Sequence, residues 1–144
     1  MVEQDTVKLL RECDAGVKMG IASIGDVEGY AKDNRLQQTL TTCRKEHEKL
    51  EGEIRMMLSR YHDDGKEPNP VAKGMAHMKT NVKLSLHMAD ATIADLMTDG
   101  CNMGVKSLNQ YLNQYEAADE RSKDIAKRLI HLEQTLAENL RGYL

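Results

Sequence analysis

Residues 13–18 read CDAGVK, and residues 101–106 read CNMGVK. In both copies a glutamate, Glu28 or Glu116, follows the lysine at the same spacing, so the chain contains a faint internal duplication. Both copies lie in stretches with apolar residues at helical spacing. Two related helical segments in a chain of 144 residues predict two related helical hairpins, and therefore a bundle of four helices.

The composition favours helices over strands. The chain has no Phe or Trp, five Tyr and nine Met, and it is rich in Leu, Ala, Glu, Lys and Gln, which are good helix formers. Strands prefer β-branched and aromatic residues, which are scarce here. We therefore expect an all-α fold, and the length predicts one domain over residues 1–144.

The charge and hydropathy of the chain argue against some classes of protein. The 20 basic and 23 acidic residues are interspersed along the chain and do not gather in one block, which argues against a nucleic-acid groove. No signal-like start and no apolar run of about 20 residues occurs, so we expect a cytoplasmic protein without a membrane partner. The three cysteines lack a C-x-x-C spacing, which predicts reduced, buried thiols.

Apolar residues at helical spacing define the expected elements. A first helix over 4–32 turns at Asp33 and Asn34, and a polar connection over 62–70 follows the second helix. An apolar stripe from 71 onward slips in phase near Gly100, so that helix either breaks or drifts, and a turn is expected between 118 and 123. The second helix has the clearest stripe, formed by Leu36, Leu40, Cys43, His47, Leu50, Ile54, Met57 and Tyr61.

Glycines inside the expected helices indicate that another group approaches the helix backbone closely at these positions. Gly16 and Gly20 share a face, as do Gly100 and Gly104. Each glycine costs about 1 kcal/mol relative to alanine unless something compensates. The glycines either leave room for a small ligand or let the two hairpins pack closely, and the density of protein interiors favours packing.

Polar residues in or near the apolar stripes are the candidate site. They are Glu28, His47, Glu116 and Glu133, of which Glu133 lies at the edge of its stripe and can turn inward or outward. Burying a carboxylate or an imidazole without a partner costs several kcal/mol. These residues are therefore candidate metal ligands, or core residues with partners inside the protein.

Several segments together resemble the ferritin-like superfamily, and more closely an uncharacterised bacterial family of small ferritin-like proteins. The segments are the glycine-bearing stretch 13–20, the Glu-rich second helix, the Gly/Pro connection, the GMAH sequence at 74–77, and residues 100–111. The resemblance implies an antiparallel four-helix bundle with helices at about 4–32, 34–61, 88–116 and 118–142. It also implies a crossover helix at about 71–86.

The chain departs from the di-iron members of that superfamily, which use two Glu-x-x-His pairs. Arg44 precedes His47 at that spacing, and Arg128 precedes His131. Glu28 and His47 also differ in height by roughly 12 Å along the hairpin. We therefore expect no dinuclear centre and a core role for His47. Glu28 either has a threonine partner (Thr39, Thr41 or Thr42) or extends its carboxylate to the nearby end of the bundle.

A short second stripe, Leu84, Met88 and Ala91, lies opposite the core face of its helix. It is either a contact with a partner subunit or scattered surface. No activated nucleophile is visible. The favoured interpretation is a non-catalytic bundle that acts through protein association as a homodimer, without a cofactor. The alternatives are a metal-binding or redox protein with a degenerate site for iron or another divalent metal, and a small-ligand carrier.

Overall fold

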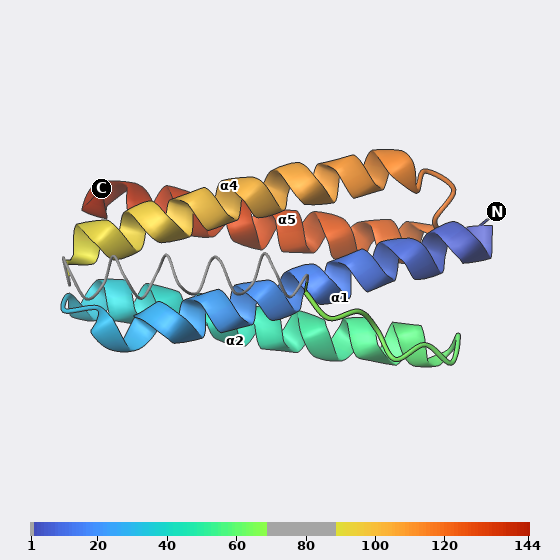
Figure 1. The fold of residues 1–144 in the computed structure, drawn as a ribbon, viewed down its shortest axis with the longest axis horizontal. Helices are drawn as coiled ribbons and strands as arrows, with labels where there is room; N and C mark the ends of the chain where they lie inside the picture. Colours follow the sequence, from blue (N-terminus) through green and yellow to red (C-terminus); the bar gives the residue numbers. More distant parts are fainter. Residues whose placement is uncertain (1, 69–88) are drawn as a thin grey trace.

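The computed structural model describes residues 2–68 and 89–144, whose long elements are four helices (Figure 1). The helices are α1 (Val2–Val27), α2 (Asn34–Ser59), α4 (Asp90–Gln114) and α5 (Glu120–Leu140). Short 3-10 turns follow α1 at Glu28–Tyr30 and α5 at Arg141–Tyr143. The described residues contain no strand, so the predicted all-α class is confirmed.

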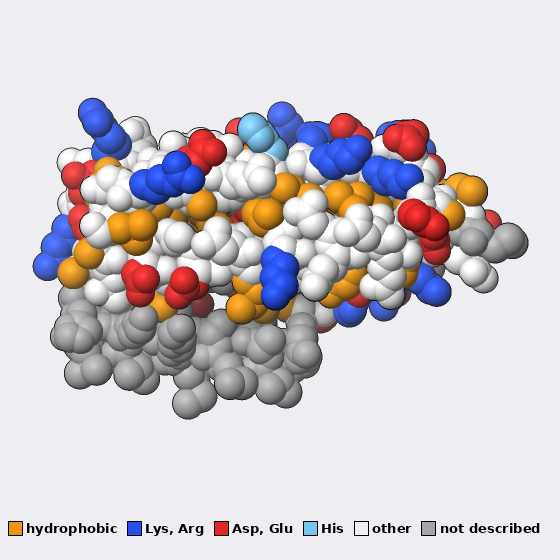
Figure 2. All heavy atoms as spheres, turned by 90° about the horizontal axis from the view of Figure 1, so that it is seen from above, with side chains coloured by type: hydrophobic (Ala, Val, Ile, Leu, Met, Phe, Trp, Pro, Cys, Tyr) orange, Lys and Arg blue, Asp and Glu red, His pale blue; other side chains and the backbone are white. Residues whose placement is uncertain are grey.

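The four helices lie lengthwise beside one another (Figure 1), and the apolar residues of their stripes form the buried core. Helix α1 packs against α2, α4 and α5, and α2 also packs against α5. The predicted stripe of α2 is buried from Leu36 to Ile54, including His47. On the face seen in Figure 2, hydrophobic side chains form a broken line along the long axis between rows of charged residues. This is the amphipathic pattern expected of surface helices in a bundle.

Aspartates begin the second helix of each hairpin. Asp33 caps α2 by accepting a hydrogen bond from the Leu36 N–H at 2.9 Å. Asp119 caps α5 by accepting one from the Ser122 N–H at 2.8 Å. An N-cap side chain satisfies one of the free N–H groups of a first helical turn. The two connections, α1 to α2 and α4 to α5, therefore use the same local chemistry.

Each connection is also held by the start of the other hairpin. Asp90, the first residue of α4, accepts hydrogen bonds from the N–H groups of Lys32 and Asp33 at 2.8 and 3.0 Å. At the opposite end, Asp5 and Thr6 of α1 accept from the N–H groups of Ala117 and Asp119 at 3.0 and 2.9 Å. Figure 1 shows the same arrangement, with the N-terminus beside the α4–α5 connection.

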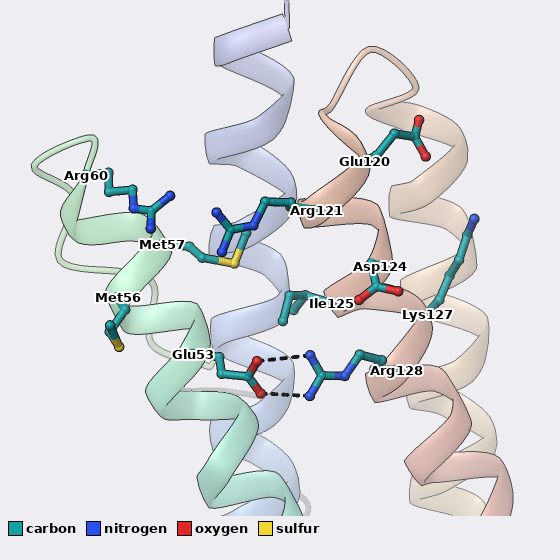
Figure 3. A pocket seen from close by; sticks show the side chains of 10 residues that line it. All are labelled: Glu53, Met56, Met57, Arg60, Glu120, Arg121, Asp124, Ile125, Lys127 and Arg128. Atoms are coloured by element: carbon teal, nitrogen blue, oxygen red, sulfur yellow. Dashed lines mark hydrogen bonds and ion pairs between the residues drawn. The ribbon is translucent and has the colours of Figure 1, made fainter.

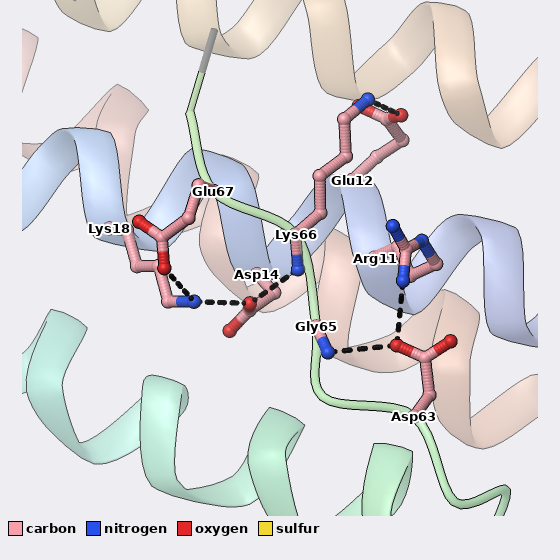
Figure 4. A network of polar contacts seen from close by, with 8 residues as sticks. All are labelled: Arg11, Glu12, Asp14, Lys18, Asp63, Gly65, Lys66 and Glu67. Atoms are coloured by element: carbon pink, nitrogen blue, oxygen red, sulfur yellow. Dashed lines mark hydrogen bonds and ion pairs between the residues drawn. The ribbon is translucent and has the colours of Figure 1, made fainter. Parts of the chain in front are cut away.

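The segment after α2 folds back along α1 (Figure 4). Buried Asp14 accepts a hydrogen bond from the Lys66 N–H at 3.0 Å. Gly65 has a positive φ of 90°, and a side chain there would collide with Asp14, so this turn requires glycine. Ion pairs on both sides of Asp14 fasten the same segment: Arg11–Asp63, Glu12–Lys66 and Lys18–Glu67.

The largest difference from the expected boundaries is at the end of α1, and the structure also decides between the two alternatives at Gly100. Helix α1 ends at Val27, five residues before the expected end, because the chain tightens into a 3-10 turn in which the Ala31 N–H donates to the Glu28 carbonyl. Helix α4 is continuous through Gly100, so the slip in apolar phase is a drift and not a break.

The predicted crossover helix (71–86), and Leu84 and Met88 of the predicted interface, lie outside the described residues. Ala91, the third member of that interface, is exposed in the first turn of α4. Over residues 2–68 and 89–144, no helix has both the length and the apolar character needed to cross a membrane.

Candidate functional site: a polar layer in the bundle core

The apolar core is divided into two clusters by a layer of polar and glycine residues. The layer takes one residue from each helix: Gly20 of α1, His47 of α2, Gly104 of α4 and Glu133 of α5. We call these four residues the polar layer. One cluster includes Leu10, Val17, Leu50, Ile54, Leu108 and Ile130, and the other includes Ile24, Leu40, Cys43, Cys101 and Leu136.

The centre of the layer is a hydrogen bond between the two hairpins. His47 Nε2 lies 2.9 Å from Glu133 Oε1, and the side chain of His47 is fully buried. The other ring nitrogen, Nδ1, lies 2.8 Å from the backbone oxygen of Cys43 one turn earlier. Glu133 retains 9% of its exposure, so the carboxylate is also largely removed from water.

These contacts determine where the protons are. A carbonyl oxygen can only accept, so Nδ1 of His47 must carry a hydrogen toward Cys43. A second proton then lies between Nε2 and the carboxylate of Glu133. Burial lowers the pKa of His47, but the interactions with Cys43 and Glu133 outweigh it and raise the pKa to about 10. The pair is therefore an imidazolium and a carboxylate at neutral pH, joined by a charge-assisted hydrogen bond.

Two thiols border the pair. Cys43 Sγ lies 3.5 Å from His47 Nδ1. Burial, and then the neighbouring Glu133, raise the pKa of the Cys101 thiol. All three cysteines, Cys13 included, are free and buried, as the sequence predicted. A thiol with a raised pKa stays protonated and is a poor nucleophile, so Cys13 and Cys101 behave as small apolar residues of the core.

The glycines of the layer make room for the pair. A Cβ on Gly20 would lie 2.7 Å from His47 Cδ2 and 2.8 Å from Nε2, closer than real Cβ contacts. A Cβ on Gly104 would lie 3.7 Å from the carboxyl carbon of Glu133. Gly16 faces Leu129 at 3.7 Å, whereas Gly100 faces nothing within 4 Å. Close packing that requires glycine is thus confirmed for Gly20, whereas an added Cβ would make ordinary contacts at Gly16 and Gly104 and would meet nothing at Gly100.

The structure brings together only two of the four candidate ligands. Glu28, just after α1, accepts from Arg44 Nε at 2.8 Å and from Thr41 Oγ1 at 3.0 Å. Glu116 is exposed in the turn after α4. His47 and Glu133 meet, and the core role predicted for His47 is confirmed.

The four candidate ligands do not form one common site in the described residues. Both ring nitrogens of His47 have partners in the protein, and Glu28 binds an arginine elsewhere. Across the part of the chain that the structure describes, no three side chains of His, Cys, Asp or Glu are grouped to hold a metal ion. The polar layer instead works as a contact between hairpins.

The neighbours of Glu133 were not found from the sequence. Cys101 and Gly104 of α4 approach it, yet both were considered only for their own packing. Their spacing of three residues places them on one helix face and was an available signal.

Comparison with known proteins finds no matching family model, no matching curated protein and no matching solved structure. A functional hypothesis for this chain therefore rests on its own residues and their arrangement.

Proposed function

We propose that this chain is a non-catalytic helical bundle of ferritin-like arrangement that acts by protein association in the cytoplasm, first as a homodimer. In this proposal the two hairpins are antiparallel, and a crossover connection joins them. The contacts of Asp90 with the first connection, and of Asp5 and Thr6 with the second, support that arrangement. The segment that returns along α1 after α2 supports a crossover (Figure 4).

The observation that carries the non-catalytic role is the use of the polar layer. His47 and Glu133 come from different hairpins and use their hydrogen-bonding capacity on each other and on Cys43. A buried ion pair contributes little net stability, but it can specify how helices dock, because a shifted alignment would leave charges unpaired. The most polar part of the core therefore serves the assembly of the fold, and functional contacts fall on the surface.

Light scattering after size-exclusion chromatography tests the homodimer. We expect twice the monomer mass of 16.2 kDa. The exposed residue Ala91 belongs to the proposed interface, so Ala91→Arg should shift the protein toward the monomer. Gln110→Arg places the same charge on an exposed position of the same helix, about 100° away from Ala91 around the helix axis, and should leave the mass unchanged. A monomer at all concentrations would refute the homodimer.

The second candidate is a metal-binding or redox protein with a degenerate site. The observation in its favour is that a histidine and a carboxylate, His47 and Glu133, meet in the core, where helical bundles build their metal sites. Elemental analysis of protein purified without chelator distinguishes the two proposals. Stoichiometric iron, manganese or zinc that is lost in His47→Gln would favour the metal-binding candidate.

A further inference from the structure

Helices α2 and α5 border a groove on the surface (Figure 3). It has a volume of about 640 Å³ and lies where α2 ends and α5 begins. Ligand pockets of small molecules have volumes of about 300–1,000 Å³ and combine apolar walls with a few placed polar groups. The groove has the corresponding size, and the chemistry of its walls decides what it can bind.

The floor of the groove, between the charged residues of its two sides, is apolar. Met57 and Ile125 face each other between the two helices, and Ile125 belongs to the buried core (Figure 3). Met56 stands at the edge with 69% of its surface exposed. Methionine side chains are flexible and adapt to apolar ligands of different shape. A short hydrocarbon group would therefore find a surface to cover here.

A closed ion pair bounds the groove at one end. Arg128 of α5 donates two hydrogen bonds to Glu53 of α2, at 3.0 and 2.8 Å. This bidentate pair neutralises both groups and joins the two helices. The charged residues that remain around the groove are three cations, Arg60, Arg121 and Lys127, and two anions, Glu120 and Asp124.

Arg60 and Arg121 are the unusual members of this set. They come from different helices and point toward one another across the groove above Met57 (Figure 3). Within the described residues, neither guanidinium has a carboxylate within ion-pair distance, whereas Arg11, Arg44 and Arg128 each have at least one. Glu120 points away from the groove (Figure 3). Its Oε1 lies 3.9 Å from Nζ of Lys123.

Two guanidinium groups that converge on one space repel each other and leave donors unused. An anion with two oxygens can accept from both, because each guanidinium presents planar N–H donors that match a carboxylate or phosphate. The apolar floor directly beneath the two arginines adds a second requirement, that the ligand carry an apolar group. Both requirements are met by an amphiphile, whose anionic head lies between the arginines and whose hydrocarbon chain lies over Met57 and Ile125.

We propose that this groove binds a small amphiphilic anion, with a carboxylate or phosphate head between Arg60 and Arg121 and a short hydrocarbon chain over Met57 and Ile125. The site is independent of the proposed homodimer, whose predicted face includes Ala91 of α4.

Isothermal titration calorimetry with octanoate and with octyl phosphate, each below its aggregation concentration, tests this site. Inorganic phosphate supplies the head alone, and octanol supplies the chain alone. We expect at least one amphiphile to bind with 1:1 stoichiometry and about tenfold more tightly than either part, since head and chain each contribute. Binding of octanoate only assigns a carboxylate ligand, and binding of octyl phosphate only assigns a phosphate.

Variants connect the binding to the two arginines. Arg60→Gln and Arg121→Gln should each weaken binding about tenfold, because a hydrogen bond to a charged group is lost. Arg35→Gln is the matched control, since Arg35 is also exposed, lies on α2 and has no ion pair within the described residues. It should bind like the unaltered protein. No binding of either amphiphile, or equal binding by all three variants, would overturn the proposal.

Discussion

Glu28 and Glu133 carry the same side chain in two different regions of the bundle. Glu28 lies at the end of the molecule, just after α1, and binds Arg44 and Thr41 of α2. Glu133 lies in the middle of α5 and binds His47 of α2. Both are contacts to α2, but the first joins the helices of one hairpin and the second joins the two hairpins.

The two pairs, Glu28–Arg44 and Glu133–His47, differ in their access to water, and therefore in how much stability depends on them. Glu28 keeps 21% of its side-chain exposure and Arg44 keeps 25%, so water remains available to both charges. His47 is fully buried. An ion pair that water can reach is worth little, whereas breaking a buried pair leaves a charge without solvent or partner. Stability should therefore depend on Glu133 far more than on Glu28.

Removing the carboxylate of Glu133 should have the largest effect. In Glu133→Leu the protonated His47 would lose its partner in the core, and we expect unfolding in urea to show a loss of about 3–5 kcal/mol. The double variant His47→Leu with Glu133→Leu removes both charges and should recover much of that loss. A loss below about 1 kcal/mol in Glu133→Leu would mean that the pair is not a charged contact of the core.

The pH dependence should identify His47 as the titrating group. Its pKa is 6.5 in an exposed imidazole and about 10 in the fold. The folded state holds the proton more tightly, so this stabilisation is complete below pH 6.5 and is lost as the pH rises toward 10. Urea unfolding between about pH 7 and 8.5 should show stability falling by up to about 1.4 kcal/mol per pH unit.

Comparison with His47→Gln isolates this slope, because the variant should be nearly flat over the same pH range. The buried thiol of Cys13 also lowers stability in alkali, since burial raises its pKa from 9.0 to about 12. That effect begins near pH 9, where the unfolded thiol ionises, so it lies above the chosen range. The same slope in both proteins would assign the pH dependence to another group.

The two glycines of the polar layer should respond in opposite directions to alanine. In Gly20→Ala the new Cβ meets His47 at 2.7 Å, and the ring is held by hydrogen bonds on both nitrogens, so we expect a loss of about 1–3 kcal/mol. In Gly104→Ala the nearest atom is 3.7 Å away, and the better helix propensity of alanine should give a gain of up to about 1 kcal/mol. Thermal unfolding of both variants measures the difference.

The sequence predicted those features that depend on spacing within one helix. The strict stripe of α2 placed His47 in the core, and Asp33 was expected where the chain turns. The orientation of Glu133 was left open, because a residue at the edge of a stripe is decided by its partner. That partner, His47, lies on another helix and far away in the sequence, and periodicity within α5 carries no information about it.

Arg44 illustrates the same limit. From the sequence, it was only the residue that replaces the glutamate of a Glu-x-x-His motif. In the structure it is the ion-pair partner of Glu28, beside the expected partner Thr41. The groove with Arg60 and Arg121 was also missed, because two exposed residues that converge from different helices leave no periodic signal.

The smallest effect is expected for the more exposed of the two pairs, Glu28 with Arg44. Glu28→Gln keeps the size of the side chain and a hydrogen-bond acceptor for Thr41 or Arg44, and it removes only the charge. Arg44 also retains Glu48, which accepts from its Nη1 at 2.8 Å. The loss of stability in urea should therefore be less than roughly a third of that in Glu133→Gln, and it should diminish in high salt, because salt screens exposed pairs. Equal losses in the two variants would remove the distinction between the buried contact and the exposed one, and they would indicate that Glu28 is as important as Glu133 for holding the helices together.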